Sequence, residues 1–197
     1  MTTRLESICV FCGSSHGDDP KFTEAARAMG QALVAAKIRL VYGGGSVGLM
    51  GVIADEVLAG EGHVTGVIPQ ALWDREVGHK NLSDLRIVST MHERKALMAE
   101  LSDGFIAMPG GVGTMEEFFE VWTWALLGVH AKPCGILNIA GYFDPLLAFM
   151  DQMVSRRFLA REFREMVLIE SEPNALLRRL NSYTPAAVAK WLDTRKT

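Results

Sequence analysis

Asp103–Gly128 reads DGFIAMPGGVGTMEEFFEVWTWALLG, and this stretch decides the expected fold because it joins a strand, a glycine turn and a long helix without a break. Residues 105–108 form a continuous apolar run, as expected of a parallel strand covered on both faces. Pro109 ends the strand, and the glycines of residues 110–113 let the backbone come close to a ligand. Thr114 is predicted to cap the helix that follows. The stretch therefore predicts one strand–turn–helix unit of an α/β protein.

The start of this helix has two alternative roles. Free N–H groups after a glycine turn form an anion site, which favours a phosphate or carboxylate ligand. Glu116 and Glu117 in the first turn suit the helix dipole but repel a bare anion unless a cation mediates. Thr114-x-x-Glu117 is also a capping box, in which Glu117 only bonds the backbone of Thr114. These residues alone leave both roles open.

Length and composition indicate one globular domain spanning residues 1–197. The chain has 49% apolar residues and 19 glycines, enough for a substantial core without disulfides or metals. Its net charge of −3 and the absence of basic runs argue against a nucleic-acid polymer or a membrane surface as partner. No segment is apolar enough to span a bilayer, and residues 1–13 do not resemble a signal peptide, so we expect a cytoplasmic protein.

The three cysteines do not predict a metal or redox site. Cys9 and Cys12 form a CxxC, but they lie in a predicted strand, and Cys134 alone cannot complete a four-ligand zinc set. We interpret all three as buried small apolar residues. Neither a metal nor a cofactor is expected.

Strands alternate with helices along the whole chain. Strands are predicted at residues 7–12, 39–42, 105–108, 134–138 and 166–169, with one ending at Gln70 and a short one at 86–88; helices are predicted at about 20–37, up to 59, at 91–101, 114–127 and 142–158, and as a C-terminal pair. This order indicates a Rossmann-like, doubly wound parallel sheet with three α/β/α layers. Ligands of such sheets bind at the carboxyl ends of the strands, which is where Ser14 lies.

A second glycine turn, residues 43–51 (GGGSVGLMG), follows the second strand. Its GxGxxG spacing matches a dinucleotide-binding turn, but no acidic residue follows about twenty positions on, which disfavours NAD. Leu49 and Met50 stand where a P-loop requires Lys and Ser or Thr, which excludes Walker-type ATP hydrolysis. Residues 71–82 are predicted to be a loop, in which His79 and Lys80 are either substrate contacts or merely solvated charges.

The helix predicted at residues 91–101 carries two cations without a local role. Thr90-x-x-Glu93 predicts a capping box, which gives Glu93 a structural role. Arg94 and Lys95 near the start of the helix oppose its dipole, so an anionic partner is expected. Glu117 together with a bound phosphate would satisfy both cations.

Three motifs resemble those of the LONELY GUY family, the cytokinin riboside 5′-monophosphate phosphoribohydrolases, in an order and spacing that cover nearly the whole chain. Residues 109–117 (PGGVGTMEE) fit PGGxGTxxE, residues 91–95 (MHERK) fit an MHERK-like segment, and residues 43–51 fit GGGxxGLMG. The resemblance implies a Rossmann-like fold and hydrolysis of the N-glycosidic bond of nucleoside 5′-monophosphates. It also implies catalytic roles for Arg94 and Glu117.

The expected chemistry agrees with this resemblance. A carboxylate beside the sugar, here Glu117, can stabilise an oxocarbenium-like state and orient water. Arg94 cannot readily release a proton and is expected to anchor substrate and stabilise charge. The predicted substrate-binding residues are Ser14, Gly43, Gly44, Gly45, Gly48, Met91, Lys95, Gly110, Gly111, Val112, Gly113, Thr114, Glu116 and Thr123.

The sequence leaves open the base preference and the choice between an enzyme and a binding module. The match is poorer over residues 71–82, where plant members place a substrate-contacting glutamate and this chain has Lys80, with Glu76 nearby, so base preference is undecided. A purine-nucleotide-binding module without turnover is the alternative function, and Glu117 argues against it because a pure binder gains little from a carboxylate near an anion. The motif has also carried a lysine decarboxylase label, but nothing in the sequence suggests a pyridoxal phosphate site.

The helix at residues 114–127 also predicts an assembly. It is apolar nearly all round, through Met115, Phe118, Phe119, Val121, Trp122, Trp124, Leu126 and Leu127. A helix of this kind is covered on a second side, and the sheet can cover only one. We therefore expect a two-fold homodimer with this helix at or near the contact.

Overall fold

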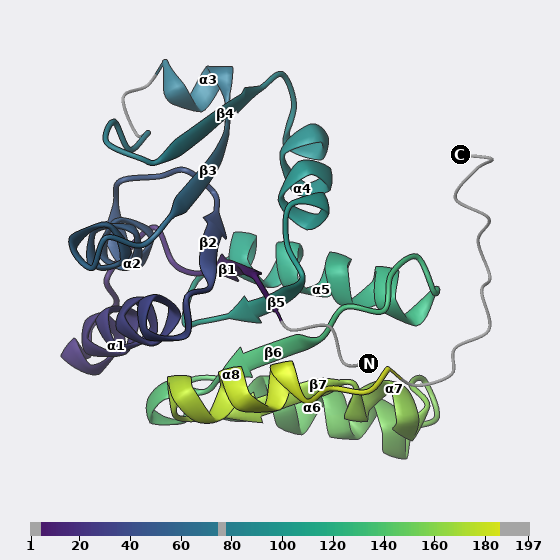
Figure 1. The fold of residues 1–197 in the computed structure, drawn as a ribbon. Helices are drawn as coiled ribbons and strands as arrows, with labels where there is room; N and C mark the ends of the chain where they lie inside the picture. Colours follow the sequence, from purple (N-terminus) through teal and green to yellow (C-terminus); the bar gives the residue numbers. More distant parts are fainter. Residues whose placement is uncertain (1–4, 75–77, 186–197) are drawn as a thin grey trace.

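The computed structural model describes residues 5–74 and 78–185, and its centre is a seven-stranded sheet in which every paired strand is parallel (Figure 1). The strand order is β4-β3-β2-β1-β5-β6-β7. The strands are β1 Ser7–Phe11, β2 Arg39–Tyr42, β3 Val64–Pro69, β4 Asp84–Val88, β5 Gly104–Ala107, β6 Cys134–Leu137 and β7 Val167–Glu170. The predicted doubly wound parallel sheet is thus confirmed.

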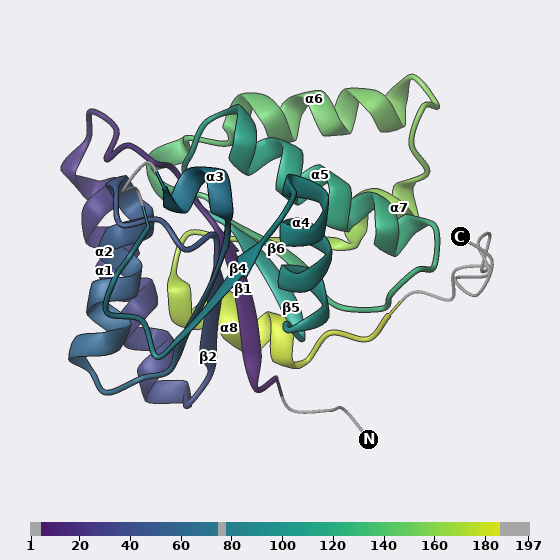
Figure 2. The same ribbon diagram turned by 90° about the horizontal axis from the view of Figure 1, so that it is seen from above.

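Helices cover both faces of the sheet, which gives the three predicted layers (Figure 2). The helices are α1 Pro20–Ala36, α2 Gly48–Ala59, α3 Gln70–Trp73, α4 Met91–Glu100, α5 Val112–Leu126, α6 Asp144–Ser155, α7 Arg161–Glu165 and α8 Pro173–Asn181, with a 3₁₀ turn at Ile139–Gly141. Side chains of α1, α2 and α8 pack on one face, and those of α4, α5 and α6 pack on the other.

The alternation of side chains along β1 explains why the core divides in two. Ile8 and Val10 belong to the cluster under α1, α2 and α8, whereas Cys9 and Phe11 belong to the cluster under α4, α5 and α6. Each fully buried aliphatic or aromatic side chain contributes about 1.5–3 kcal/mol, so the central strands are anchored from both faces. Every residue of β1 is buried, as predicted for a central parallel strand.

The direction of strand addition reverses between β1 and β5, and this reversal positions the ligand site. Strands β2, β3 and β4 extend the sheet on one side of β1, and β5, β6 and β7 extend it on the other. The two central strands stay joined beyond their ends, because the N–H of Gly13 donates to the carbonyl of Pro109 over 3.0 Å. A crevice at the carboxyl ends of such strands is where doubly wound sheets bind ligands.

Two predicted features at helix starts differ in outcome. Thr90 caps α4 by accepting from the N–H of Glu93 over 3.1 Å, and the Glu93 carboxylate accepts from the N–H of Ser89 over 2.7 Å. The Thr114–Glu117 capping box, in contrast, is wrong. Helix α5 starts two residues earlier, at Val112, because Gly111 has an extended backbone and its carbonyl already accepts from the N–H of Met115. Thr114 is therefore a buried residue of the first turn.

In residues 71–74 and 78–82, the predicted loop contains a helix end and tertiary contacts that its sequence does not indicate. It begins with the short helix α3, and Glu76 lies outside the described residues. His79 is neither solvated nor open to a ligand, because it is buried and its Nε2 lies 2.9 Å from Oδ1 of Asp55 on α2. The backbone N–H of His79 also donates to the carbonyl of Gly44 over 2.9 Å. His79 thus joins this segment to the glycine turn at residues 43–51.

The C-terminal part contains two further corrections and one prediction that extends beyond the described residues. The helix predicted at 142–158 is α6, which begins only at Asp144 because the 3₁₀ turn precedes it. The short helix α7 is not predicted at all, since its five residues show no apolar period. Of the predicted C-terminal helix pair, α8 is present and the second helix lies outside the described residues.

Helix α5 is covered more completely than the sheet alone would allow. Figure 2 shows α5 between α4 and α6. Trp122 is buried, and its indole N–H donates to the carbonyl of Phe163 in α7 over 3.3 Å. Phe119 and Trp124 stay partly exposed. Neighbouring helices therefore account for part of the apolar surface of α5, and the homodimer stays a prediction.

Cys9, Cys12 and Cys134 are buried and free, as the sequence predicts. Burial raises the pKa of all three thiols above the usual range, which keeps them protonated and unreactive. Among the described helices, none combines the length and the apolar character that crossing a membrane requires.

Candidate functional site

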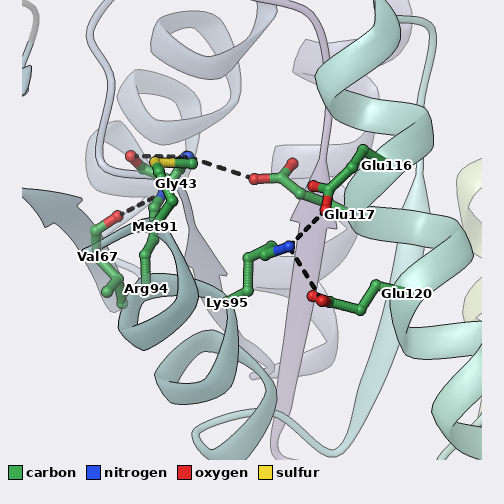
Figure 3. A network of polar contacts seen from close by, with 8 residues as sticks. All are labelled: Gly43, Val67, Met91, Arg94, Lys95, Glu116, Glu117 and Glu120. Atoms are coloured by element: carbon green, nitrogen blue, oxygen red, sulfur yellow. Dashed lines mark hydrogen bonds and ion pairs between the residues drawn. The ribbon is translucent and has the colours of Figure 1, made fainter.

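Arg94 of α4 lies beneath the ends of β2 and β3, with its guanidinium fixed by the backbone. Its Nε donates to the carbonyl of Val67 over 3.1 Å, and its Nη2 donates to the carbonyl of Gly43 over 3.2 Å. Both bonds are buried. A side chain held through two of its nitrogens has one orientation, so its third nitrogen points in a defined direction (Figure 3).

That third nitrogen faces Glu117. Nη1 of Arg94 lies 3.4 Å from Oε1 of Glu117, and the two side chains are only 10% and 12% exposed. Burial, the largest influence, raises the pKa of Glu117, and the charge of Arg94 opposes this rise. A carboxylate with a raised pKa is a stronger base than an ordinary one, and Arg94 helps it to stay ionised. The predicted catalytic pair is thus brought together.

Lys95, the next residue of α4, reaches two other carboxylates of α5 (Figure 3). Its Nζ makes a short hydrogen bond with Glu116 and lies 3.0 Å from Oε1 of Glu120. Burial lowers the pKa of Lys95, but the hydrogen bonds with Glu116 and Glu120 outweigh it and raise the pKa. The expectation that Glu117 together with a bound phosphate would satisfy both cations is therefore wrong for Lys95, whose partners are Glu116 and Glu120. Helical spacing could have indicated Glu120, which lies four residues after Glu116.

The first turn of α5 is open to solvent. Added Cβ atoms at Gly111 and Gly113 would have nothing within 4 Å, and Val112 is 88% exposed. The first N–H groups of a helix have no partner within that helix, and here they follow an open glycine turn. This arrangement can bind an anion such as a phosphate.

The first turn of α2 is already occupied by the protein. The N–H groups of Leu49 and Met50 point to the carbonyl of Gly13, at 3.0 and 3.4 Å. Gly48 has a φ of +58°, and an added Cβ there would lie 2.2 Å from the backbone carbon of Ser14. Of the two glycine turns, the one before α5 therefore leaves its first amides open to a ligand, and the one before α2 does not.

A pocket lies beside the first turn of α5, at the point where the strand order reverses. Its volume is about 270 Å³, and its lining residues are Gly13, Ser14, Ser15, His16, Gly17, Phe22, Leu49, Pro109, Gly110, Gly111 and Tyr142. Tyr142 donates from its hydroxyl to the carbonyl of Gly110 over 2.6 Å, and its ring packs edge-on against Phe22. The sequence identifies Ser14 here but not Tyr142, which comes from a distant segment.

The remaining predicted residues lie at different distances from this centre. Sδ of Met91 lies 3.9 Å from Nη1 of Arg94, at the edge of the pair. Gly44 has a φ of +72°, and both Gly44 and Gly45, which follow Gly43 in the chain, are buried. Thr123 is exposed on α5, six residues beyond Glu117, and no described contact joins it to the Arg94–Glu117 pair.

Among the described residues, no three His, Cys, Asp or Glu side chains cluster in a way that could hold a metal ion. The described site offers the Arg94–Glu117 pair, the neighbouring Lys95 cluster and the open amides of α5.

Comparison with known proteins gives a family. Residues 50–180 match the family model described as "Possible lysine decarboxylase". A probable cytokinin riboside 5′-monophosphate phosphoribohydrolase of Oryza sativa subsp. japonica is 51% identical over 181 residues, which are 92% of this chain and 81% of that protein. A cytokinin riboside 5′-monophosphate phosphoribohydrolase of Arabidopsis thaliana is 49% identical over 185 residues, covering 93% of this chain and 84% of that protein.

The chain belongs to the LONELY GUY family. Solved structures extend the likeness of this LONELY GUY protein at the level of the fold. The molybdenum cofactor carrier protein of Chlamydomonas reinhardtii has a TM-score of 0.68 at 17% identity, over 91% of this chain and 100% of that one. The molybdenum cofactor binding protein of Rippkaea orientalis has a TM-score of 0.67 at 20% identity, over 91% and 98%. At such identities the likeness shows a shared Rossmann-type fold.

Proposed function

We propose that this LONELY GUY protein hydrolyses the N-glycosidic bond of cytokinin riboside 5′-monophosphates, and of AMP, to a free purine base and ribose 5-phosphate. The observation that carries the proposal is the buried Arg94–Glu117 pair beside the open first turn of α5. The names of relatives 46–51% identical to the chain give the activity on cytokinin riboside 5′-monophosphates and do not mention AMP.

The reaction exchanges the base for water at C1′ of the ribose. The bond between C1′ and the base nitrogen breaks, and water supplies a hydroxyl to C1′ and a proton to the base. Positive charge develops on the sugar as the base leaves, and a carboxylate beside it stabilises that charge. Glu117, buried and ionised beside Arg94, has this role and orients the attacking water.

Arg94 acts through its fixed charge. Guanidinium does not release its proton near neutral pH, so Arg94 is assigned to anchoring the substrate and holding Glu117 as a carboxylate. The open amides of Gly111, Val112 and Gly113 are the proposed phosphate site, with the glycines of this turn allowing close approach. Ser14 and the pocket lined by Tyr142 lie next to that site.

The decarboxylase named in the family description is not proposed. A pyridoxal phosphate enzyme forms a Schiff base with a neutral lysine amine. Lys95, the buried lysine of this site, makes hydrogen bonds with Glu116 and Glu120 that raise its pKa and keep it charged. Its surroundings therefore fit an ion pair and do not fit such a nucleophile.

The proposal is tested by incubating the protein with AMP and with isopentenyladenosine monophosphate and measuring free base by chromatography. The wild type is expected to release base, and Glu117→Gln to lose about 10³-fold in rate, within the range for a positioned acid–base group. Glu24→Gln makes the same chemical change on the exposed side of α1 and should leave the rate unchanged. Binding of AMP without release of base would instead support a nucleotide-binding module.

We further propose that the protein works as a homodimer, with α5 at or near the contact. Partly exposed Phe119 and Trp124 on α5 support this arrangement. Sedimentation equilibrium at micromolar concentration tests it, and a fully active 21.6 kDa species would contradict it. A cytoplasmic location is proposed as well, since charged nucleotides do not cross membranes unaided; cell fractionation tests it.

A further inference from the structure

Two parallel bridges of charged side chains join α4 to α5 (Figure 3). Arg94 forms one bridge with Glu117 over 3.4 Å. Lys95, the adjacent residue, forms the other with Glu120 over 3.0 Å and with Glu116. The first bridge contains the proposed catalytic groups, and the second lies directly beside it with no assigned role.

The two carboxylates that hold Lys95 are not equivalent. The side chain of Glu116 is 51% exposed, whereas that of Glu120 is 25% exposed. Oε2 of Glu120 is buried without a hydrogen-bond partner among the described residues, so Lys95 is the contact that compensates its charge. A buried charge needs its partner far more than an exposed one does. Glu120 is therefore the more constrained partner of Lys95.

We propose that Glu120 is a positioning residue, which holds Lys95 away from Glu117 and so leaves the Glu117 carboxylate to Arg94. The proposal rests on the hydrolase function given above. Lys95 has three N–H donors and lies near all three glutamates of α5. Once Glu120 loses its charge, Lys95 is expected to turn toward Glu116 and Glu117 and to compete with Arg94.

The charges around Glu117 make this effect measurable. Burial has the largest influence and raises the pKa of Glu117. The charges of Arg94 and Lys95 on α4 lower this pKa, and those of Glu116 and Glu120 on α5 raise it. The buried thiols of Cys9 and Cys12, in and just after β1, face Glu117 as neutral groups. Removing the charge of Glu120 should therefore lower the pKa of Glu117. Removing the charge of Lys95 should raise it. A merely structural role would not give opposite shifts.

The experiment compares wild type, Glu120→Gln, Lys95→Met and Lys95→Arg by two readouts. The first is the pH profile of kcat on AMP, whose acid limb reports ionisation of Glu117. It should move to lower pH in Glu120→Gln and to higher pH in Lys95→Met. We expect kcat to fall about tenfold in Glu120→Gln, where Lys95 competes with Arg94 for Glu117, because small misplacements of catalytic groups are costly. Lys95→Arg keeps the charge and should restore the wild-type limb. Glu100→Gln, an exposed change at the far end of α4, is the control with unchanged activity.

The second readout is the titration of the Glu117 carboxyl carbon by NMR in the same proteins, which needs no substrate. A Glu117 pKa that falls in Glu120→Gln, and falls less when Lys95→Met is also present, supports the proposal even if the wild type releases no base, a result that would overturn only the hydrolase function. A Glu117 pKa that stays constant in both variants, or a loss of rate that follows only the melting temperature, overturns the positioning role.

Discussion

The glycine turn before α2 is filled by the protein's own atoms, whereas the glycine turn before α5 is packed at Gly110 and open at Gly111 and Gly113. An added Cβ at Gly43 would lie 1.8 Å from Nη2 of Arg94, and one at Gly51 would lie 2.3 Å from the carbonyl of Ser46. Added Cβ atoms at Gly111 and Gly113 would meet nothing within 4 Å. The turn before α2 thus needs glycine for its own packing. The turn before α5 needs it, we infer, for a ligand.

This difference separates two functions that look alike in sequence. The turn before α2 uses its carbonyls, since Gly43 accepts from Arg94 and Gly44 accepts from His79. The turn before α5 presents N–H groups. Carbonyls hold Arg94, the cation of the proposed catalytic pair, and amides suit the phosphate of the proposed substrate. A glycine pattern therefore shows where another group approaches the backbone closely. The neighbouring atoms show whether that group belongs to the protein or leaves room for a ligand.

Gly43→Ala should have the largest effect of the changes that test this comparison. Its methyl group would occupy the space of the Arg94 guanidinium, so the arginine must move. A displacement of about 1 Å in a catalytic group can cost about 100-fold, and kcat is expected to fall by that order. Steady-state kinetics on AMP measure this. A kcat within threefold of the wild type would show that Arg94 is not held by this turn.

Gly113→Ala should have a smaller and different effect. No described atom lies within 4 Å of the added methyl group. Alanine also favours a helix over glycine by about 1 kcal/mol, so the melting temperature should not fall. The methyl group crowds the proposed phosphate site, and KM for AMP is expected to rise about tenfold, or about 1.4 kcal/mol, with little change in kcat. An unchanged KM would place the phosphate elsewhere.

Asp55→Asn should have the smallest effect. It weakens the contact with His79, whose N–H holds the carbonyl of Gly44 beside the arginine-binding carbonyl of Gly43. The Asp55 side chain is 72% exposed, so the interaction is screened, and kcat/KM should fall only about two- to threefold. Asp151→Asn, which breaks a similarly exposed pair with Arg164, is the matched control and should not change kcat/KM.

Sequence patterns predict most of the framework, because buried parallel strands are apolar runs. The bounds of β2 match the prediction, and the helix predicted to end at Ala59 does end there. The start of α5 is misplaced because Thr114 suggests a cap, whereas the extended backbone of Gly111 allows an earlier start. Local signals cannot show which of two permitted starts the tertiary structure selects.

The candidate site is predictable only where a motif contains it. Arg94 and Glu117 lie in two such motifs, and the structure brings them together. Tyr142 lies 32 residues from Gly110 and its hydrogen bond depends on the packing of a separate element. In the sequence, His79 has the pattern of an ordinary loop residue, and only the fold places Asp55 of α2 beside it. Contacts between distant segments leave no periodic pattern in a single sequence. The sequence therefore does not indicate the contacts of Tyr142 and His79.

The most direct measurement is the ratio of kcat/KM for AMP to that for adenosine in the wild type, Gly43→Ala and Gly113→Ala. The wild-type ratio should be at least about 100, since charge-assisted hydrogen bonds to a phosphate contribute about 1.5–3 kcal/mol each. Gly113→Ala should lower this ratio about tenfold, because only the nucleotide uses the open turn. Gly43→Ala should lower both rates together and preserve the ratio. Comparable turnover of AMP and adenosine by the wild type, or a ratio that falls in Gly43→Ala and not in Gly113→Ala, would contradict this division between the two turns.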